Sequence, residues 1–417
     1  MTPVDPTQPL RASVPHTRAD FHAAQGVLLV VRSPPAAPQP VKGQPTLVAG
    51  NPLEGVEILI AVWDDGSVTA LNGHVDLGTG IRTALAQIVA EELDVPLACV
   101  HMVLGNTASA PNQGATIASA SIQIHAKPLR TAAAQARQWL LAQAAVQLGM
   151  PADALQLQGG VVRAIASASP STTTSTSPPA SGDKPAHSLP YGSLIKGRHQ
   201  VLLLDDNTPA KPPGDYTVVG RSVPRVDIPA KVRGDLIYVH DVRVPGMLHG
   251  RVVRPPYAGA DHGDFIGNTL ESVDKTSIAH IPGIRAVVVI RDFVGIVAER
   301  EEQAEQALRE LRVVWKDWPG FPRQDSPEAI AQAISANPST QRRLVDEGDV
   351  DAALAGADQA MPRTYVWPYQ LHASIGPSCA VAEWVPGEGV GVGGANGRMT
   401  CGPAPRTPMC CVPIWPA

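Results

Sequence analysis

Strand-type and helical segments alternate in the first third of the chain, and this alternation constrains the fold more than any other feature. Residues 56–62 (VEILIAV) and 68–74 (VTALNGH) are β-type runs joined by Asp65-Gly66, a pair that favours the positive φ of a tight hairpin turn. Apolar residues at helical spacing follow from Ile81 to Val89, and Asp94 with Pro96 ends that pattern. With the strand and helix that follow, this gives the order strand, helix, strand, helix with polar loops between, which indicates an α/β domain.

A strand over residues 100–104 and a long helix over 128–148 continue the same pattern. The helix is rich in Ala, Leu and Gln, and Gly149 followed by Pro151 is a typical helix ending. Its expected buried face consists of residues at helical spacing: Leu129, Ala133, Ala136, Leu140 and Ala144.

The remaining segments differ in composition. Residues 1–50 are Pro-rich and aperiodic, which indicates an extended arm, and the Ser/Thr/Pro tract at 164–188 indicates a flexible linker because it has little apolar area to bury. After this linker, an α+β block is expected, with strands at 236–242, 247–253 and 284–290 and helices at 299–311 and 327–335. Residues 386–417 are crowded with Gly, Pro and Cys, so we expect an aberrant tail without a packed element.

Charge and composition exclude several classes of protein. The net charge is −5 and no basic stripe is present, which argues against nucleic acid as a partner. No apolar run reaches the roughly 18 residues of a membrane-spanning helix, and the N-terminus does not have the pattern of a secretory signal. The 5 cysteines make no disulfide framework in a chain of 417 residues. We therefore expect a cytoplasmic protein without a membrane span.

Two polar segments are candidates for binding a phosphate or another anion. Gly78-Thr79-Gly80 lies between a strand and a helix, where free backbone N–H groups and the absence of side chains would let an anion approach. A second segment, residues 105–121, carries hydroxyls just before the long helix. The candidate cofactor-binding residues are Gly78, Thr79, Gly80, Thr107, Thr116, Ser119 and Ser121. The alternative interpretation of both segments is structural: turn glycines and a capped helix.

Other chemical motifs are weak. The histidines, among them His74, His101 and His125, have no His-x-x-x-His or Cys-x-x-Cys spacing, and each is interpreted as a loop or core histidine. Gly389-x-Gly-x-x-Gly394 has the dinucleotide-binding pattern, but no helical segment follows it. The hypothesis that the chain is an unrelated nucleotide-binding module therefore has only weak support from this motif.

Three segments together resemble the molybdopterin-binding large subunits of the molybdenum hydroxylases, the xanthine dehydrogenase and aldehyde oxidase family. The first is GHVDLGTGIRTALAQIVAEELDVPLACVHMVLGNT from Gly73, although most of the family has Gly-Gln-Gly where this chain has Gly-Thr-Gly. The second, VVGRSVPRVDIPAKVRGDLIYVHDVRVPGMLHGRVVRPP with IPGIRAVVVIRDFVGIVAE, resembles their α/β hammerhead domain. The third, residues 371–384, is similar to the start of their main cofactor domain.

The resemblance implies a domain organisation. It implies an N-terminal molybdopterin-binding domain portion at 51–163, a hammerhead domain at 189–320 and the start of the main cofactor domain at 321–385. The cofactor segment precedes the hammerhead, as in the branch typified by isoquinoline 1-oxidoreductase and nicotinate dehydrogenase.

The resemblance also implies a function. Members of that branch hydroxylate an aromatic N-heterocycle, and related enzymes an aldehyde, with water as the oxygen source. They use a molybdopterin cytosine dinucleotide and pass electrons to a small iron–sulfur subunit that holds a 2Fe-2S cluster. The family's glutamate base is marked by no motif here, so no catalytic residue and no metal ligand is assigned. The alternative is a truncated, non-catalytic remnant that at most binds a partner subunit.

Overall fold

The structure of the chain is a computed structural model, and it describes residues 14–34, 55–114, 116–165, 188–256, 267–317, 326–336, 338–363, 365, 367, 379–386, 397–401 and 410–411. The chain divides into two compact units, Met1–Val242 with Ser378–Ala417, and Arg243–Pro377. Each unit has its own sheet and its own buried core.

A mixed five-stranded sheet lies at the centre of the first unit, in the order β4-β3-β2-β1-β8. Its strands are β1 (Val27–Arg32), β2 (Glu57–Trp63), β3 (Val68–Asn72), β4 (Val100–Leu104) and β8 (His199–Leu203). β2 is antiparallel to β1 and to β3, whereas β3 is parallel to β4 and β1 is parallel to β8. The expected hairpin is confirmed, since Val62 pairs with Val68 and Gly66 in the turn has a φ of +83°.

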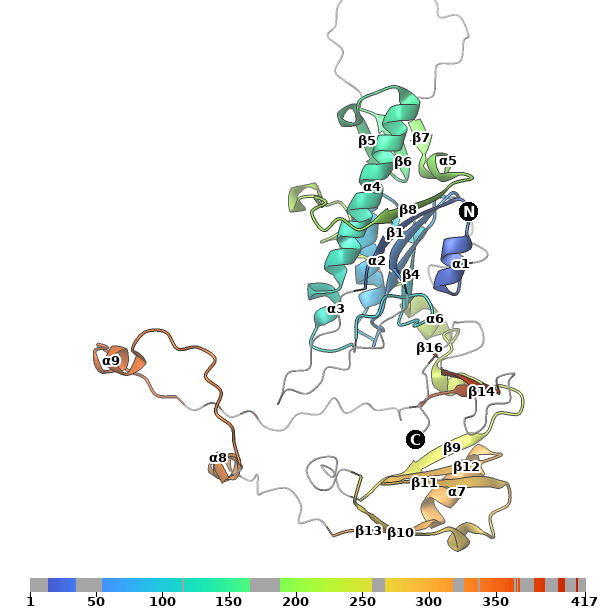
Figure 1. Cartoon of the computed structure of the whole chain (residues 1–417), viewed down its shortest axis with the longest axis vertical. Helices are drawn as coiled ribbons and strands as arrows, with labels where there is room; N and C mark the ends of the chain where they lie inside the picture. The colour runs from blue at the N-terminus through green and yellow to red at the C-terminus, as the bar shows by residue number, and fades with distance from the viewer. Residues whose placement is uncertain are drawn as a thin grey trace, which may run out of the picture. The chain divides into compact units, whose positions relative to one another are not determined.

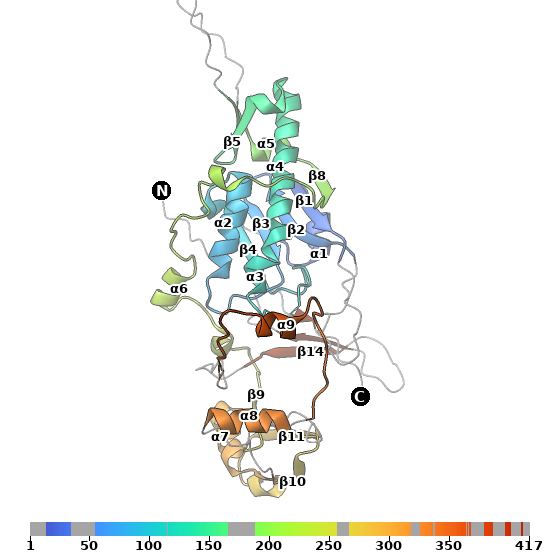
Figure 2. The ribbon, with the colours of Figure 1, turned by 90° about the vertical axis from the view of Figure 1, so that its left-hand side faces the viewer.

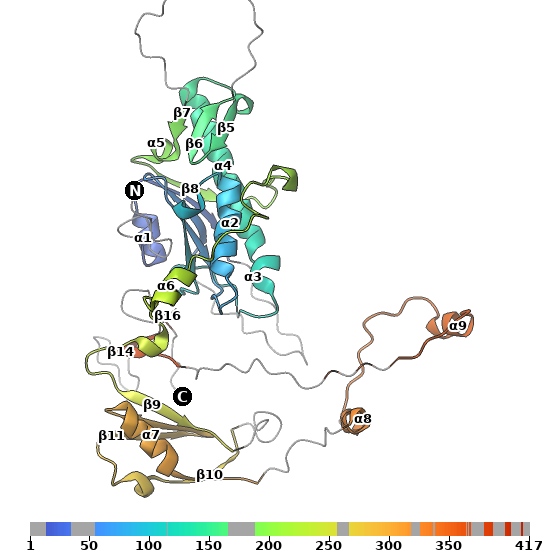
Figure 3. The same ribbon diagram turned by 180° about the vertical axis from the view of Figure 1, so that it is seen from behind.

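Helices cover both faces of this sheet, which explains why its central strands are apolar along their length. α2 (Ile81–Leu93) and α4 (Ala126–Leu148) lie on one face, and α1 (Arg18–Ala23) lies on the other (Figure 1 and Figure 3). All residues of β2 and β3 are buried. A strand that is covered on both faces has a continuous apolar run instead of an alternating one.

α2 and α4 begin and end close to where the sequence predicts. α2 ends at Asp94, which adopts the left-handed conformation, and α4 ends at Gly149 in the same conformation. The predicted stripe of α4 is confirmed, because these residues are all buried: Leu129, Ala133, Ala136, Leu140 and Ala144. The two helices lie side by side across the sheet (Figure 2).

The extended arm predicted for residues 1–50 is wrong for its described part. Residues 18–23 form α1, and residues 27–32 form β1, which is an interior strand of the sheet. The five apolar residues Val27–Val31 stand in Pro-rich sequence, and the run is too short to show a period. In the structure all five are buried.

The predicted domain start at residue 189 is also too early. β8 pairs with β1, so this segment belongs to the first unit, and the second unit begins at Arg243. Of the linker predicted at 164–188, residues 166–187 lie outside the described part of the structure.

The first unit also contains a small sheet, which a short helix follows. β5 (Leu155–Gln158), β6 (Val161–Ala164) and β7 (Ser188–Pro190) form an antiparallel sheet, and α5 (Tyr191–Ile195) follows it. The buried Tyr191 hydroxyl donates a 2.6 Å hydrogen bond to the carbonyl oxygen of Leu93, which joins α5 to the end of α2. Burial raises the pKa of Tyr191 well above its usual value, so this hydroxyl stays a donor.

Replacing Tyr191 by phenylalanine should lower the free energy of unfolding by about 1–2 kcal/mol, because the Leu93 carbonyl then loses its buried donor. Urea denaturation of the full chain measures this change. The exposed Tyr365 is the control, and its phenylalanine variant should leave the free energy unchanged. Equal midpoints for all three proteins would contradict the prediction.

The second unit contains a three-stranded sheet, a two-stranded sheet and a helix. The sheets have the orders β11-β12-β9 and β10-β13. Their strands are β9 (His249–Val253), β10 (Leu270–Asp274), β11 (Ile284–Ile290), β12 (Phe293–Ala298) and β13 (Arg312–Trp315), and α7 (Glu301–Glu310) packs on β9 and β12. The predicted strands at 247–253 and 284–290 and the helix at 299–311 are confirmed.

The strand predicted at residues 236–242 is wrong. This segment forms a 3₁₀ turn, η4 (Val239–Asp241), in which the Asp241 carboxylate accepts a 2.9 Å hydrogen bond from the Tyr238 N–H. Such a side-chain-to-backbone bond competes with strand pairing.

Short helices and a terminal sheet make up the remaining elements: α3 (Ala120–Gln123), α6 (Ile228–Arg233), α8 (Pro327–Ala336) and α9 (Val350–Ala355). β14 (Ala382–Pro386), β15 (Gly397–Cys401) and β16 (Cys410–Cys411) pair antiparallel. The expectation that residues 386–417 have no regular structure is therefore wrong for β15 and β16. The Gly389 motif lies outside the described residues. Among the residues that the structure describes, no helix has the length and apolar character needed to cross a membrane.

Candidate functional site

The two polar segments follow neighbouring strands. Residues 73–80, here the first loop, follow β3, and residues 105–119, the second loop, follow β4. β3 and β4 are parallel, with Asn72 opposite Leu104 in the register, so both loops begin at the same edge of the sheet (Figure 2). The carboxyl ends of parallel strands are the usual place for ligand binding in α/β sheets.

Hydrogen bonds join the two loops directly. The side-chain oxygen of Gln113 accepts a 2.7 Å bond from the Gly73 N–H, and the Thr116 hydroxyl accepts a 3.0 Å bond from the Val75 N–H. The Ser121 hydroxyl, just after the second loop, lies 2.7 Å from Nδ1 of His74. Thr116 and Ser121 therefore contact the segment that leads to Gly78-Thr79-Gly80.

The backbone N–H groups at the start of α2 are not free, contrary to the sequence prediction. The Asp76 carboxylate accepts hydrogen bonds from the N–H groups of Gly78 (2.9 Å), Gly80 (3.1 Å) and Arg82 (3.1 Å). A carboxylate at a helix N-terminus satisfies unpaired donors and interacts favourably with the helix dipole. Asp76 thus occupies the position that the sequence analysis gave to an external anion.

The other candidate residues present their side chains to solvent. Thr79, Thr107 and Ser119 are exposed, and the hydroxyls of all three lie on the two loops. Gly80 lies beneath Arg225, whose guanidinium donates a 2.8 Å bond to the Gly78 carbonyl oxygen. Two side chains therefore hold the first loop: Asp76, which is part of the loop, bonds to its N–H groups, and Arg225, which is not, bonds to the Gly78 carbonyl oxygen.

His74 is a core histidine, as the sequence analysis expected. It is fully buried, and its Nε2 lies 3.3 Å from the carbonyl oxygen of Gln113. Because a carbonyl only accepts, Nε2 is the donor in this contact. The His125 ring stands edge-on to His74, with 4.4 Å between the ring centroids. Within the described part of the chain, no group of three or more His, Cys, Asp or Glu side chains is arranged to hold a metal ion.

Two histidines near the loops should make the stability depend on pH. Burial, with a smaller contribution from Arg82, lowers the pKa of His101 to about 4, and burial followed by His74 and Arg32 lowers that of His125 to about 4. The unfolded chain binds these protons near pH 6.5, so it holds more protons than the folded chain between about pH 6.5 and pH 4. The free energy of unfolding should therefore fall as the pH drops through this range.

Urea denaturation between pH 7 and pH 4.5 measures this dependence. The double variant H101Q/H125Q should have a flatter stability profile over that range than the native sequence. Identical slopes for the two proteins would contradict the assignment.

Buried donors without an acceptor lie beside the loops, and sequence reasoning missed them. Nδ2 of the fully buried Asn72, the side-chain nitrogen of Gln113 and the Ser109 hydroxyl have no hydrogen-bond partner among the described residues. Buried polar groups are nearly always paired in native proteins, so each of these donors needs an explanation. The sequence features that could have pointed to these donors are an Asn at the end of a predicted strand and a Gln among small residues in a loop.

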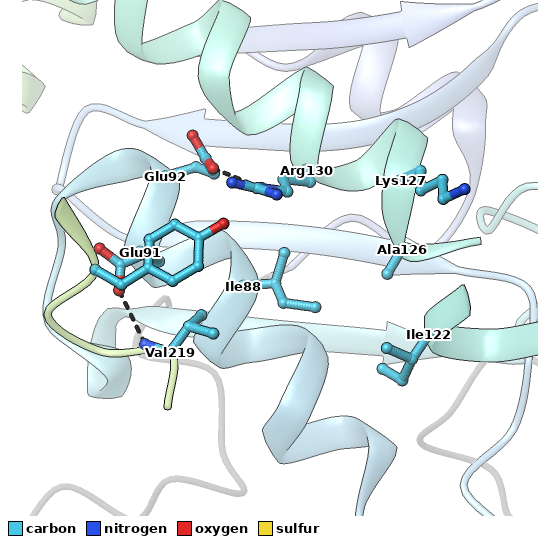
Figure 4. A pocket seen from close by; sticks show the side chains of 9 residues that line it. Ile88, Glu91, Glu92, Ile122, Ala126, Lys127, Arg130 and Val219 are labelled. Carbon is cyan, nitrogen blue, oxygen red and sulfur yellow. Dashed lines mark hydrogen bonds and ion pairs between the residues drawn. The ribbon is translucent and has the colours of Figure 1, made fainter. Parts of the chain in front are cut away.

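A separate cavity of about 220 Å³ lies between α2, the start of α4 and residues 211–219. Figure 4 shows its lining residues: Ile88, Glu91, Glu92, Ile122, Ala126, Lys127, Arg130, Tyr216 and Val219. One oxygen of Glu91 accepts bonds of 2.6–2.9 Å from three consecutive backbone N–H groups, at residues 217–219. Burial raises the pKa of Glu91, but these bonds outweigh it, so the pKa is lowered. The carboxylates here fasten residues 211–219 to α2, which is a structural role.

The comparisons with known proteins place both loops in a recognised domain. Residues 32–228 match the family described as "Molybdopterin cofactor-binding domain". The chain is 53% identical over 374 residues to a nicotinate dehydrogenase subunit of Pseudomonas putida, covering 89% of this chain and 29% of that protein. It is 31% identical over 324 residues to the beta subunit of isoquinoline 1-oxidoreductase from Brevundimonas diminuta, covering 71% of this chain and 39% of that protein. The solved quinoline 2-oxidoreductase of Pseudomonas putida 86 aligns with a TM-score of 0.26 and 23% identity, covering 33% of this chain and 15% of that one.

The loops thus lie in a cofactor-binding α/β domain. Residues 32–228 therefore belong to a molybdopterin cofactor-binding domain, and the resemblance of the chain to molybdopterin-binding subunits of the molybdenum hydroxylases is confirmed. The chain spans 29% of the length of the first relative and 39% of the second.

Proposed function

We propose that this chain contributes one wall of the molybdenum-cofactor site of a hydroxylase. The substrate would be an aromatic N-heterocycle or an aldehyde, and water would supply the oxygen. The observation that carries this proposal is the direct hydrogen bonding between the first and second loops at the carboxyl ends of β3 and β4, inside the matched residues. Two relatives are named for nicotinate and isoquinoline, which are both aromatic N-heterocycles.

The residues of the second loop suit an oxygen-rich cofactor, whereas the start of α2 does not. Thr107 and Ser119 carry exposed hydroxyls, which can donate hydrogen bonds to the acceptor atoms of a pterin and a pyrophosphate. Asp76 already occupies three amides at the start of α2 and would repel a phosphate there. We therefore assign the molybdopterin cytosine dinucleotide to the second loop, with Thr79 reaching it from the first.

The cofactor, when bound, supplies the molybdenum centre that accepts electrons from the substrate. We propose that these electrons pass to a small iron–sulfur subunit with a 2Fe-2S cluster, as the family resemblance implies. The part of the second unit from Arg243 to about residue 320 would then be most of the α/β hammerhead domain, and residues 321–385 the start of the main cofactor domain. The cytoplasmic location stays a prediction, to be tested by cell fractionation.

Molybdenum analysis of the full chain, produced in cells that make the cofactor, tests the proposal. Molybdenum and pterin should co-purify with the chain, and the double variant T116V/S121A should lose most of both, because its hydroxyls join the two loops. The matched control is T131V/S193A, whose hydroxyls bond to backbone carbonyls away from both loops. Absence of molybdenum from the native sequence would contradict the proposal. Molybdenum without reduction of a dye by nicotinate would favour the non-catalytic alternative.

A further inference from the structure

The second loop is also fastened from its far side, by a buried carboxylate. Glu57, the first residue of β2, is fully buried. One of its oxygens pairs with Nε of Arg32 at 2.8 Å, and the other accepts a 2.7 Å hydrogen bond from the Asn112 N–H in the second loop. Arg32 faces Glu57 directly in the register of β1 and β2, so the carboxylate cannot easily turn away from the loop.

A buried carboxylate at this position needs a reason. Removing an ionised carboxylate from water costs several kcal/mol, and a well-packed apolar pair of similar size is often at least as stable as a buried ion pair. Stability alone therefore gives Glu57 no advantage over an apolar residue. What an apolar side chain could not provide is an acceptor for the Asn112 N–H.

A second cation holds the preceding part of the same loop. Nη2 of Arg18, the first residue of α1, donates a 2.6 Å bond to the carbonyl oxygen of Ala110, and the Arg18 N–H donates a 3.1 Å bond to that of Ala108. Phe21 of the same short helix is fully buried and lies 6.0 Å from the Trp63 ring, measured between centroids. α1 is thus anchored in the core while its first residue reaches the loop.

Burial lowers the pKa of Arg18, and the charge of Glu57 opposes that effect. The two charges therefore act on one another, although each contacts a different part of the loop. Together they fix residues 108–112 against the sheet, while Gln113 and Thr116 fix the following residues to the first loop.

We propose that Glu57 and Arg18 are positioning residues for the cofactor: they hold the second loop in the conformation that presents the exposed Thr107 hydroxyl. This inference rests on the proposed function, because it concerns how the same site is shaped. Neither residue is assigned a contact with the cofactor. They act on the site through their hydrogen bonds to the backbone of Ala110 and Asn112, which fix the conformation of the second loop.

Variants at Glu57 test the inference in the full chain. E57M removes the acceptor, so the backbone N–H groups of residues 108–114 should exchange with deuterium roughly tenfold faster, even without cofactor. The molybdenum content per folded chain should fall by about tenfold, the loss typical of residues that orient a binding group. E57Q keeps an oxygen for the Asn112 N–H and should recover most of the protection and most of the molybdenum.

Y191F is the control for a purely structural effect, since it removes a buried hydrogen bond elsewhere in the same unit. If Y191F and E57M lose equal fractions of molybdenum, Glu57 acts only through stability and the inference is wrong. If the native chain binds molybdenum and the E57M variant binds as much, this inference is wrong, but the proposed function stands. A native chain without molybdenum would overturn the proposed function, and the positioning role with it.

Discussion

Replacing Glu92 by alanine should lower the free energy of unfolding by about 3 kcal/mol, because it breaks an ion pair whose carboxylate is fully buried and takes this acceptor from Arg130 and the Lys211 N–H. Glu92 is fully buried on α2, and its carboxylate accepts a 2.7 Å bond from Nε of Arg130 on α4. It also accepts a 3.1 Å bond from the Lys211 N–H, and Nη2 of Arg137 lies 3.9 Å away. One carboxylate therefore joins α2, α4 and the segment that covers them.

Urea denaturation followed by near-ultraviolet circular dichroism measures this loss. E92Q keeps the shape and an acceptor oxygen, so it should lose clearly less than E92A, and it remains measurable if E92A does not fold. The control is D235A, because Asp235 forms an exposed ion pair with Arg233 that should contribute little. A loss in E92A no larger than that in D235A would refute the assigned role.

Elements whose signal is local were predictable from the sequence. α4 shows a helical stripe over 23 residues with Gly149 at its end, and the hairpin shows Asp65-Gly66 between two β-type runs. The pairing of β1 with β8 was not predictable, because Leu29 and Val201 are register partners that lie 172 positions apart in the sequence (201 − 29). The sequence of neither short apolar run predicts which strand it pairs with.

Some features of the candidate site were also predictable from the sequence, and others were not. The positions of the two loops follow from the β-strand, loop, helix order, whereas the hydrogen bond between Thr116 and the Val75 N–H, which joins the loops, is known only from the structure. The role of Asp76 was missed, although an Asp two residues before Gly78 was a visible capping signal. Glu57 and Arg18 could not be found from sequence, because each acts on a loop 50 or more residues away.

Gly73 should tolerate no side chain, because the backbones of the two loops touch there. A Cβ at this position would lie 2.1 Å from the carbonyl oxygen of Pro111 and 3.1 Å from the nitrogen of Gln113. Both are backbone atoms of the second loop, so the conflict cannot be relieved by turning a side chain. G73A should therefore separate the loops by about an ångström and cost about 1–3 kcal/mol or more in the free energy of unfolding.

The loss of binding in G73A should exceed the loss of stability. Separating the loops breaks the bond from the Gly73 N–H to Gln113 and weakens those at Val75 and His74, so the groups that we assign to the cofactor no longer converge. The molybdenum content of G73A should therefore fall by about ten- to a hundredfold, the loss typical when groups that orient a metal site are removed. The control is G214A, since Gly214 has open space around its Cβ position and no positive φ. G214A should match the native chain in stability and in molybdenum. A G73A protein that also matches it would show that the two loops do not form one site.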